Sequence, residues 1–368
     1  MASVFSPVHP PPSGHGAVPG VVFAVEILRA WAQARGDVPA ADVATSRAAT
    51  TLLAQNRLLG LTGALLLKAA PDDQIAETTG AFRRLTADMN GSGLIMMRRL
   101  TTALDGAPAR VVFYKGVVLQ QNLYGTPFAR PASDIDLLTA PATYARVAAV
   151  LQSAGHRLDP HTDTLWWRWF LAEQQFRVGE DAQNIDLHHR LQQPGCPMPR
   201  RADRLIAESV LQPFLGGQVR TFRDDHTLLV AAMSLAKALH HREPAGRYVG
   251  DVERLLRRLS PEGWSAVASE AAVMGLARTL DLAIRCVQAV FQTVPVEYQP
   301  AILPEIDDLD LQCMLLAPAQ APRWVRRRRL LLALCDRPID AVTAWLVMAA
   351  SETARRATEN HAAQGTAR

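Results

Sequence analysis

Two short segments that carry acidic residues inside apolar runs constrain the fold most. SDIDLLT, at 133–139, alternates polar and apolar positions, and NIDLHHR, at 184–190, begins in the same way. Such alternation predicts β-strands in which every second side chain shares one face of the sheet. Asp134 and Asp136 therefore point to the same side of the first strand, and Asp186 lies in the second. If the two strands are neighbours, three carboxylates converge.

Convergent carboxylates repel one another unless a cation neutralises them, and such oxygen ligands suit Mg²⁺ or Mn²⁺. Three of them around metal ions are typical of phosphoryl or nucleotidyl transfer. A lone Asp-x-Asp pair could instead face solvent at a sheet edge, so the neighbouring residues matter. Lys115 and Gly116 join a predicted strand to a predicted helix, where glycine and free N–H groups favour a phosphate. Arg130 precedes the acidic strand, where it could grip a triphosphate.

The rest of the central segment mixes strands and helices. VVFYKG predicts a strand, and VVLQQNLYG and PATYARVAAVLQSAG predict helices that end at glycine. WWRWFLAEQQFRV and QNIDLHHR predict two further strands joined by a turn at 179–182. We expect the tryptophans of the first to pack in the core, with a platform for a nucleobase or peptide as the alternative. His189 is expected to point away from the acidic face.

Helical spacing of apolar residues dominates on both sides of this segment. Before it, the pattern extends over about 21–104; after it, helices are predicted near 226–241, 247–259, 262–275, 277–292 and 338–358. The expected fold is α+β, with a small mixed sheet of four or five strands flanked by N- and C-terminal helical domains. The predicted divisions are a flexible Pro/Gly-rich tail (1–20), a helical region (21–107), an α/β core (108–198), a helical domain (199–350) and a polar tail (351–368).

Composition excludes several classes of protein. A net charge of +4 over 368 residues is too weak to indicate nucleic-acid binding by itself. No apolar stretch is long enough to cross a membrane, and the N-terminus lacks the features of a secretory signal. The four cysteines are far apart, so neither a zinc site nor a disulfide framework is predicted, and a cytoplasmic location is expected. The basic run Arg323–Arg329 predicts a solvated surface, with contact to nucleic acid or an acidic peptide as the alternative.

The stretch YKGVVLQQNLYGTPFARPASDIDLL, followed later by IDLHHR, resembles the bacterial "uncharacterised nucleotidyltransferase" family of the polymerase-beta-like superfamily. The resemblance implies that Asp134 and Asp136 bind the metals and that Asp186 is the third carboxylate, a metal ligand and a base toward the acceptor hydroxyl. Gly116 would belong to the phosphate-binding turn. Most of the superfamily has Gly-Gly or Gly-Ser there, whereas Val117 follows Gly116 in this chain. Lys115 would then replace the missing hydroxyl.

Three further residues are candidates for nucleotide binding. His188 follows Asp186 by two positions and shares its face, so it could contact substrate or phosphate, or simply be a hydrogen-bonded strand histidine. Lys237 and His241 share a helical face in SLAKALHHREPAGRYVGDVERLL, where the resembling family often has similar residues. The alternative for this helix is a solvated face with a structural ion pair.

The combined prediction is Mg²⁺-dependent transfer of a nucleoside monophosphate from an NTP, either ATP or another, to an acceptor. A peptide, protein or small molecule is the expected acceptor, and tailoring of a peptide natural product is one such reaction. Toxin-like modification of tRNA is the nucleic-acid alternative. A non-catalytic nucleotide-binding protein that keeps the fold is the alternative from another class, and three retained carboxylates argue against it.

Overall fold

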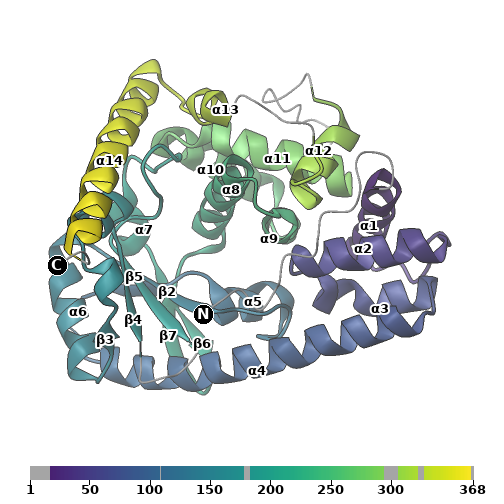
Figure 1. Cartoon of the computed structure of the whole chain (residues 1–368), viewed down its shortest axis with the longest axis horizontal. Helices are drawn as coiled ribbons and strands as arrows, with labels where there is room; N and C mark the ends of the chain where they lie inside the picture. The colour runs from purple at the N-terminus through teal and green to yellow at the C-terminus, as the bar shows by residue number, and fades with distance from the viewer. Residues whose placement is uncertain (1–16, 108, 178–182, 294–305, 322–326, 366–368) are drawn as a thin grey trace.

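A five-stranded sheet lies at the lower left of the view in Figure 1, with helices from both ends of the chain beside it. The computed structural model describes residues 17–107, 109–177, 183–293, 306–321 and 327–365. The strands of the sheet are β1 (Val111–Phe113), β2 (Asp134–Thr139), β3 (Arg157–Leu158), β4 (Glu173–Arg177) and β5 (Asn184–His188). A separate two-stranded hairpin consists of β6 (Val210–Phe214) and β7 (Gly217–Thr221).

The helices fall into three groups by position in the chain. Those before the sheet are α1 (Ala17–Ala32), α2 (Val43–Gln55), α3 (Leu59–Ala69) and α4 (Asp73–Leu104). Those between strands are α5 (Gly116–Tyr124), η1 (Pro141–Thr143), α6 (Tyr144–Ser153), η2 (Pro160–Thr162), η3 (Trp166–Leu171) and α7 (Ala202–Ala207). Those after the hairpin are α8 (Asp224–His241), α9 (Gly246–Leu256), α10 (Pro261–Met274), α11 (Ala277–Phe291), α12 (Asp308–Leu316), α13 (Arg327–Ala333) and α14 (Pro338–Gly365).

The strand order is β1-β2-β5-β4-β3, so the two acidic strands are neighbours. β2 pairs with β5 in parallel, whereas the β1–β2, β4–β5 and β3–β4 pairs are antiparallel. A parallel pair needs a long crossover, which η1 to β4 supplies. The predicted mixed sheet in an α+β fold is confirmed.

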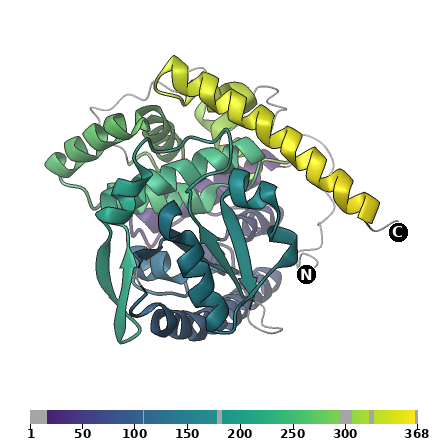
Figure 2. The same cartoon turned by 90° about the vertical axis from the view of Figure 1, so that its left-hand side faces the viewer.

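The two faces of the sheet have different partners. One face presents Ile135, Leu137 and Ile185 to a core that also contains Met97 of α4 and Leu151 of α6. The opposite face carries the acidic residues and faces α8 and α9, which line the same cavity as those acids. The hairpin, seen beside the sheet in Figure 2, contributes Phe214 and Val219 to the first core. Period-two alternation thus separates an apolar layer from a polar one.

Helices from the two ends of the chain share the larger core. Leu28 of α1 and Leu53 of α2 belong to the same buried cluster as Leu235 of α8 and Val287 of α11. Arg29 Nε also donates to the carbonyl of Val290 at 2.8 Å. The predicted N- and C-terminal helical regions therefore stabilise each other, while the predicted domain bounds stay predictions.

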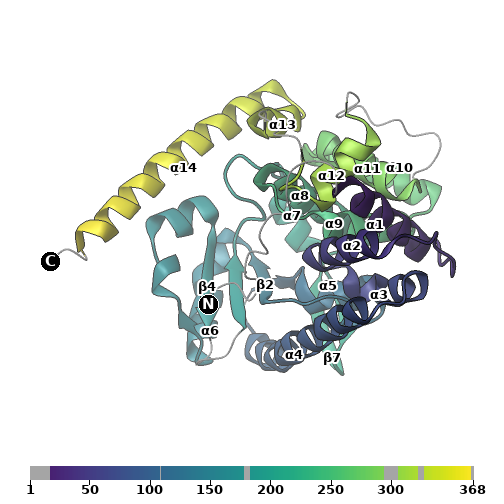
Figure 3. The ribbon, with the colours of Figure 1, turned by 45° about the vertical axis from the view of Figure 1, so that its right-hand side comes forward.

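Several elements differ from the sequence prediction. WWRWFL forms the helical turn η3 rather than a strand, because Arg168 N–H donates to the Thr164 carbonyl and Ala172 then turns left-handed. Leu165 and Trp169 are 72% and 66% exposed there, so these two side chains are not in the core, contrary to the prediction for the tryptophans. The strand β3, the hairpin, and helices α7, α12 and α13 were not predicted from the pattern. α14 continues to Gly365, through the predicted polar tail, and extends away from the body (Figure 3).

Some predictions lie partly outside the described residues. These are the first 16 positions of the N-terminal tail, the turn at 179–182 and positions 323–326 of the basic run. Where the description begins, α1 already covers positions 17–20. None of the helices in the described ranges is both long and apolar enough to cross a membrane.

Candidate active site

The acidic residues meet because of the register between β2 and β5. Asp136 lies directly opposite Asp186, and Asp134 lies opposite Asn184. Since residues at matching positions of paired strands share a face, the carboxylates of Asp136 and Asp186 are direct neighbours. The convergence predicted from the sequence is confirmed for these two residues, and Asp134 follows on the same face one pleat away.

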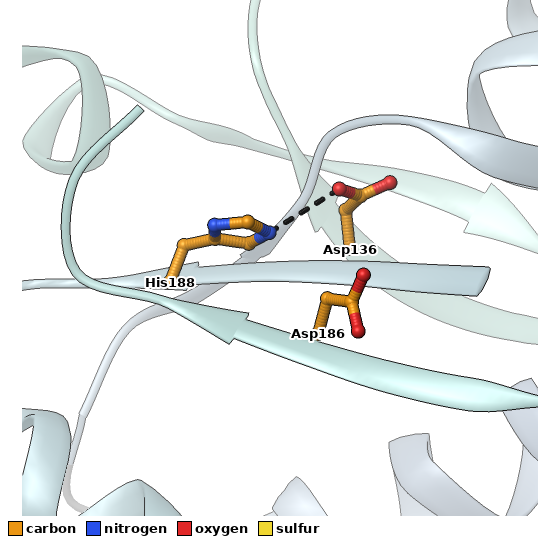
Figure 4. A group of neighbouring side chains, drawn as sticks. All are labelled: Asp136, Asp186 and His188. Carbon is orange, nitrogen blue, oxygen red and sulfur yellow. Dashed lines mark ion pairs between the residues drawn. The ribbon is translucent and has the colours of Figure 1, made fainter. Parts of the chain in front are cut away.

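Asp136, Asp186 and His188 form a buried cluster whose ligand atoms all lie within 4.8 Å of one another (Figure 4). His188 Nε2 lies 3.3 Å from Asp136 Oδ1, and His188 Nδ1 lies 3.6 Å from Glu173 Oε2 of β4. Asp186 Oδ1 is buried and has no hydrogen-bond partner among the described residues. A buried oxygen without a donor is costly unless something else satisfies it. Two carboxylates and an imidazole fit a divalent cation, and the unsatisfied oxygen gives it a ligand.

The environments of the three carboxyls push their pKa values apart. Burial, followed by the charges of Asp136 and Asp134, raises the pKa of Asp186 to about 9. Burial and the charge of Asp136 likewise raise the pKa of Asp134. Burial alone would also raise the pKa of Asp136, but the Lys115 ammonium and His188 hold it well below its usual range. Asp136 is therefore the ionised carboxylate of the three. Asp134 and Asp186 beside it resist ionisation unless a further cation is present.

The turn between β1 and α5 places a lysine against these acids. Lys115 Nζ lies 2.9 Å from Asp136 Oδ1, and although burial opposes its charge, that carboxylate raises the pKa of Lys115 well above normal. Gly116 opens α5 with φ +60°, and an added Cβ would lie 3.2 Å from the Asp134 carbonyl oxygen. Only glycine adopts this left-handed turn without strain so close to a neighbouring strand. The N-terminus of α5 consequently opens beside the carboxylates.

A cavity of about 140 Å³ lies at this point. The strand side contributes Asp134 and Asp136, and the β1–α5 turn contributes Lys115 and Gly116. The helical side contributes residues of α8, such as Ser234, and residues of α9. Arg57, from the connection after α2, also lines this side. The charged residues that line the cavity are Arg57, Lys115, Arg130, Asp134, Asp136, Arg247 and Asp251.

With this geometry in place, comparison with known proteins gives a consistent result. The model of the family described as "Uncharacterised nucleotidyltransferase" matches residues 44–292, which include the cavity and all three aspartates. The chain belongs to this family. It is therefore a nucleotidyltransferase, as the sequence predicts. No curated protein matches the chain.

Two solved structures of another nucleotidyltransferase are similar over about half of the chain. A solution structure of the antibiotic-resistance factor ANT(2″)-Ia has 14% sequence identity, covers 49% of this chain and 91% of its own, and has a TM-score of 0.35. A crystal structure of ANT(2″)-Ia in complex with adenylyl-2″-tobramycin has 14% identity, covers 49% of this chain and 96% of its own, and has a TM-score of 0.34.

In this member of the nucleotidyltransferase family, Arg130 lines the cavity but is already paired. Its two terminal nitrogens each lie 2.7 Å from a carboxylate oxygen of Asp251 in α9, and the Tyr124 hydroxyl donates to the same carboxylate at 2.6 Å. Arg130 and Asp251 are both buried. A bidentate pair of this kind fixes the loop before β2 against α9. Binding of a triphosphate by Arg130 stays a prediction.

Lys237 and His241 lie outside the cavity lining. Thr227, Val230 and Ser234 line it from one face of α8, and the two predicted residues continue that face over the next turns. Lys237 is half-buried and close enough to Cys196 to affect the thiol electrostatically. His241 is exposed and packs edge-on against His240, with ring centroids 4.8 Å apart. Their contact with nucleotide stays a prediction.

Sequence reasoning missed Arg57 and Glu173. Glu173 reaches the cluster because β4 pairs with β5 in a register that sets it opposite His188. Alternation in EQQFR could have placed it on the acidic face once that register was known. Arg57 follows the last residues of α2, and no local pattern marks it.

His189, as expected, points away from the acidic face: its Nε2 lies 2.9 Å from the Arg168 carbonyl oxygen, and its ring packs on Tyr144.

Proposed function

We propose that this nucleotidyltransferase moves a nucleoside monophosphate from an NTP to a hydroxyl, or a similar group, of an acceptor molecule. The observation that carries the proposal is the direct pairing of Asp136 with Asp186 in parallel strands, with His188 beside them, at the edge of a cavity lined by Lys115 and Gly116. Family membership supports the reaction class.

The reaction exchanges one phosphorus–oxygen bond for another. The acceptor oxygen forms a bond to the α-phosphorus, the bond from that phosphorus to the oxygen bridging to the β-phosphate breaks, and pyrophosphate leaves with the bonding electrons. We assign the acceptor's proton to Asp186, which lies directly opposite Asp136 on the neighbouring strand and has a buried oxygen without a hydrogen-bond partner among the described residues. Lys115 and the free N–H groups at the start of α5 would position the phosphates.

Asp134, Asp136 and Asp186 would hold the divalent cation, Mg²⁺ or Mn²⁺, with His188 in reach of the same site. When bound, the cation would keep Asp186 ionised at neutral pH, lower the acceptor's pKa and offset charge on the phosphates. The chain's own contribution is to hold these groups in fixed positions on paired strands, which is the dominant requirement for phosphoryl chemistry.

For the acceptor we favour a peptide, a protein or a small molecule over tRNA, because the net charge of +4 is too small for a long nucleic-acid track. Tailoring of a peptide natural product is our preferred case. Such a reaction belongs in the cytoplasm, where NTPs are available and where the four unpaired cysteines would remain reduced.

The test combines purified protein, Mg²⁺ and each of the four labelled NTPs with a peptide encoded beside the gene, with aminoglycoside-like polyols and with tRNA. Label should appear on one acceptor class and depend on both Asp134 and Asp136. Label on tRNA alone would overturn the acceptor proposal. Binding of an NTP without transfer to any acceptor would favour the non-catalytic alternative.

A further inference from the structure

Two arginines on the helical side of the cavity have no acidic partner. The cavity lining contains four cations and three carboxylates. Lys115 is paired with Asp136, and Arg130 is paired with Asp251. Arg57 and Arg247 form no ion pair with any described residue, which leaves two guanidinium groups facing one unpaired carboxyl, that of Asp134. The pKa of that carboxyl is itself raised.

The fold brings these arginines together through the residues that precede them. Asn56 is buried, and its Oδ1 accepts a 2.8 Å hydrogen bond from the backbone N–H of Gly246 at the start of α9. Asn56 Nδ2 donates to the carbonyls of Leu52 and Leu316. An added Cβ on Gly246 would lie 2.8 Å from Asn56 Oδ1, so the contact requires glycine. Because Asn56 and Gly246 are joined, Arg57 and Arg247 enter the cavity side by side.

Each arginine is held in place by groups that leave its charge uncompensated. Arg57 has a left-handed backbone, with φ +56°, and its Nη1 donates to the Pro131 carbonyl at 3.3 Å. Arg247 donates to the Tyr248 hydroxyl at 2.6 Å and lies over that ring at 4.5 Å. Arg247 Nε is buried without a hydrogen-bond partner among the described residues. A buried charged donor without an acceptor indicates that a ligand supplies one.

Electrostatics agrees with the geometry. Burial, followed by the nearby charge of Arg247, lowers the pKa of Arg57 to about 10, although the charge of Asp134 acts in the opposite direction. Two like charges held this close in a partly buried cavity repel each other until an anion lies between them. A ligand with several negative charges would remove this repulsion, so the cavity favours such a ligand.

We infer that Arg57 and Arg247 form the binding site for the terminal phosphates of the nucleotide donor, opposite the carboxylates and the start of α5. The inference rests on the proposed function for the identity of the ligand, a nucleoside triphosphate. The cavity places both guanidinium groups in one space with Lys115 and the start of α5, and such a set of cationic groups suits a polyphosphate chain. Planar guanidinium groups are also the side chains best matched to phosphate oxygens.

The test measures binding of inorganic tripolyphosphate to the full-length protein by calorimetry, in the presence of Mg²⁺. Arg57→Gln and Arg247→Gln should each weaken binding by about tenfold or more, and Arg57→Lys should retain part of the affinity. Arg242→Gln is the matched control, because Arg242 also has a left-handed backbone, with φ +57°, after a helix but does not line the cavity. The affinity of the Arg242→Gln variant for tripolyphosphate should stay within about twofold of wild type.

The outcomes separate this site from the proposed reaction. If the wild type binds tripolyphosphate through both arginines but transfers nucleotide to no acceptor, the anion site stands and the proposed function fails. If the wild type transfers nucleotide while both glutamine variants bind tripolyphosphate as tightly as Arg242→Gln does, the site is wrong. Absence of tripolyphosphate binding by the wild type would also overturn it. Thermal melting of each variant shows that it is folded, and Arg57→Lys replaces Arg57→Gln should the latter not fold.

Discussion

The cavity has a strand wall and a helical wall that differ in charge and in origin. The strand wall is the acidic side: Asp134 and Asp136 line the cavity, and Asp186 lies beside Asp136 on the adjacent strand. The helical wall carries Arg57 and Arg247, which lie far apart in the region that matches the family model. Alternation within each strand and the pairing of β2 with β5 assemble the first wall, whereas packing between helices far apart in the chain assembles the second. The strand wall should therefore control the chemistry, and the helical wall should control donor binding and stability.

The largest effect is expected on the strand wall. Asp136→Asn removes the carboxylate that touches both Lys115 and His188, so nucleotide transfer should fall by about 10³-fold or more. Release of pyrophosphate from the NTP measures this loss. Asp88→Asn, at an exposed position of α4, is the matched control and should retain full activity. An Asp136→Asn enzyme within tenfold of wild type would show that the strand wall is not the reaction centre.

The second effect tests the ion pair between Arg130 and Asp251, which joins α9 of the helical wall to the loop before β2. Asp251→Asn leaves Arg130 buried without its counter-charge, which should lower the free energy of unfolding by about 3–5 kcal/mol in a urea titration. The double variant Arg130→Met with Asp251→Leu should recover most of this loss, because it removes both buried charges. Asp340→Asn breaks two more exposed pairs, with Arg200 and Arg337, and should have a much smaller effect. Equal effects from Asp251→Asn and Asp340→Asn would contradict the proposed attachment.

This difference between the walls also explains what the sequence could predict. Alternation in SDIDLLT and NIDLHHR sets Asp134, Asp136 and Asp186 on the right faces, and the two strands needed only to be neighbours. Lys115 and Gly116 were predictable from a strand that runs into a helix. Arg57 was not, since its position depends on Asn56 binding the start of α9 far along the chain. Contacts of this kind leave no periodic signal.

The turn WWRWFL shows the other limit of pattern reading. Its aromatic residues favour a strand by propensity, but the backbone closes a helical turn and leaves Trp169 exposed. The hairpin β6–β7 was missed because Pro213 argues against a strand in β6 and because Val219 is the one apolar side chain in β7. Both elements are decided by packing rather than by local preference.

The third effect is the pH dependence of cation binding, which tests the raised pKa of Asp186 in the strand wall. Because the pKa of Asp186 is about 9, a divalent cation must displace its proton at neutral pH. Affinity for Mn²⁺ should therefore rise by up to about tenfold per pH unit between pH 6 and pH 8, with release of a proton that calorimetry in two buffers can measure. Asp186→Asn should bind the ion more weakly and lose this proton release. Affinity independent of pH in the wild type would contradict the assignment.

The same shift has a consequence for the metal-free protein. The folded state holds the Asp186 proton up to about pH 9, whereas the unfolded chain loses it near the ordinary value of 3.8. Between these limits the folded state binds more protons, so stability falls as the pH rises. In chelator at pH 8, Asp186→Asn should therefore melt at a higher temperature than the wild type, and saturating Mn²⁺ should reverse that order.

The smallest effect compares two glycines at opposite ends of α5. Gly116 and Gly125 have similar left-handed backbones, with φ +60° and +71°, so alanine at either should cost about 1–2 kcal/mol of stability. Only at Gly116 does the added Cβ meet a neighbour, the Asp134 carbonyl oxygen at 3.2 Å; at Gly125 there is open space. Gly116→Ala should move the phosphate turn away from the strand wall and lower kcat/KM by about tenfold, with Gly125→Ala close to wild type. If both variants lose stability equally and neither loses activity, the turn contributes to the fold but not to catalysis.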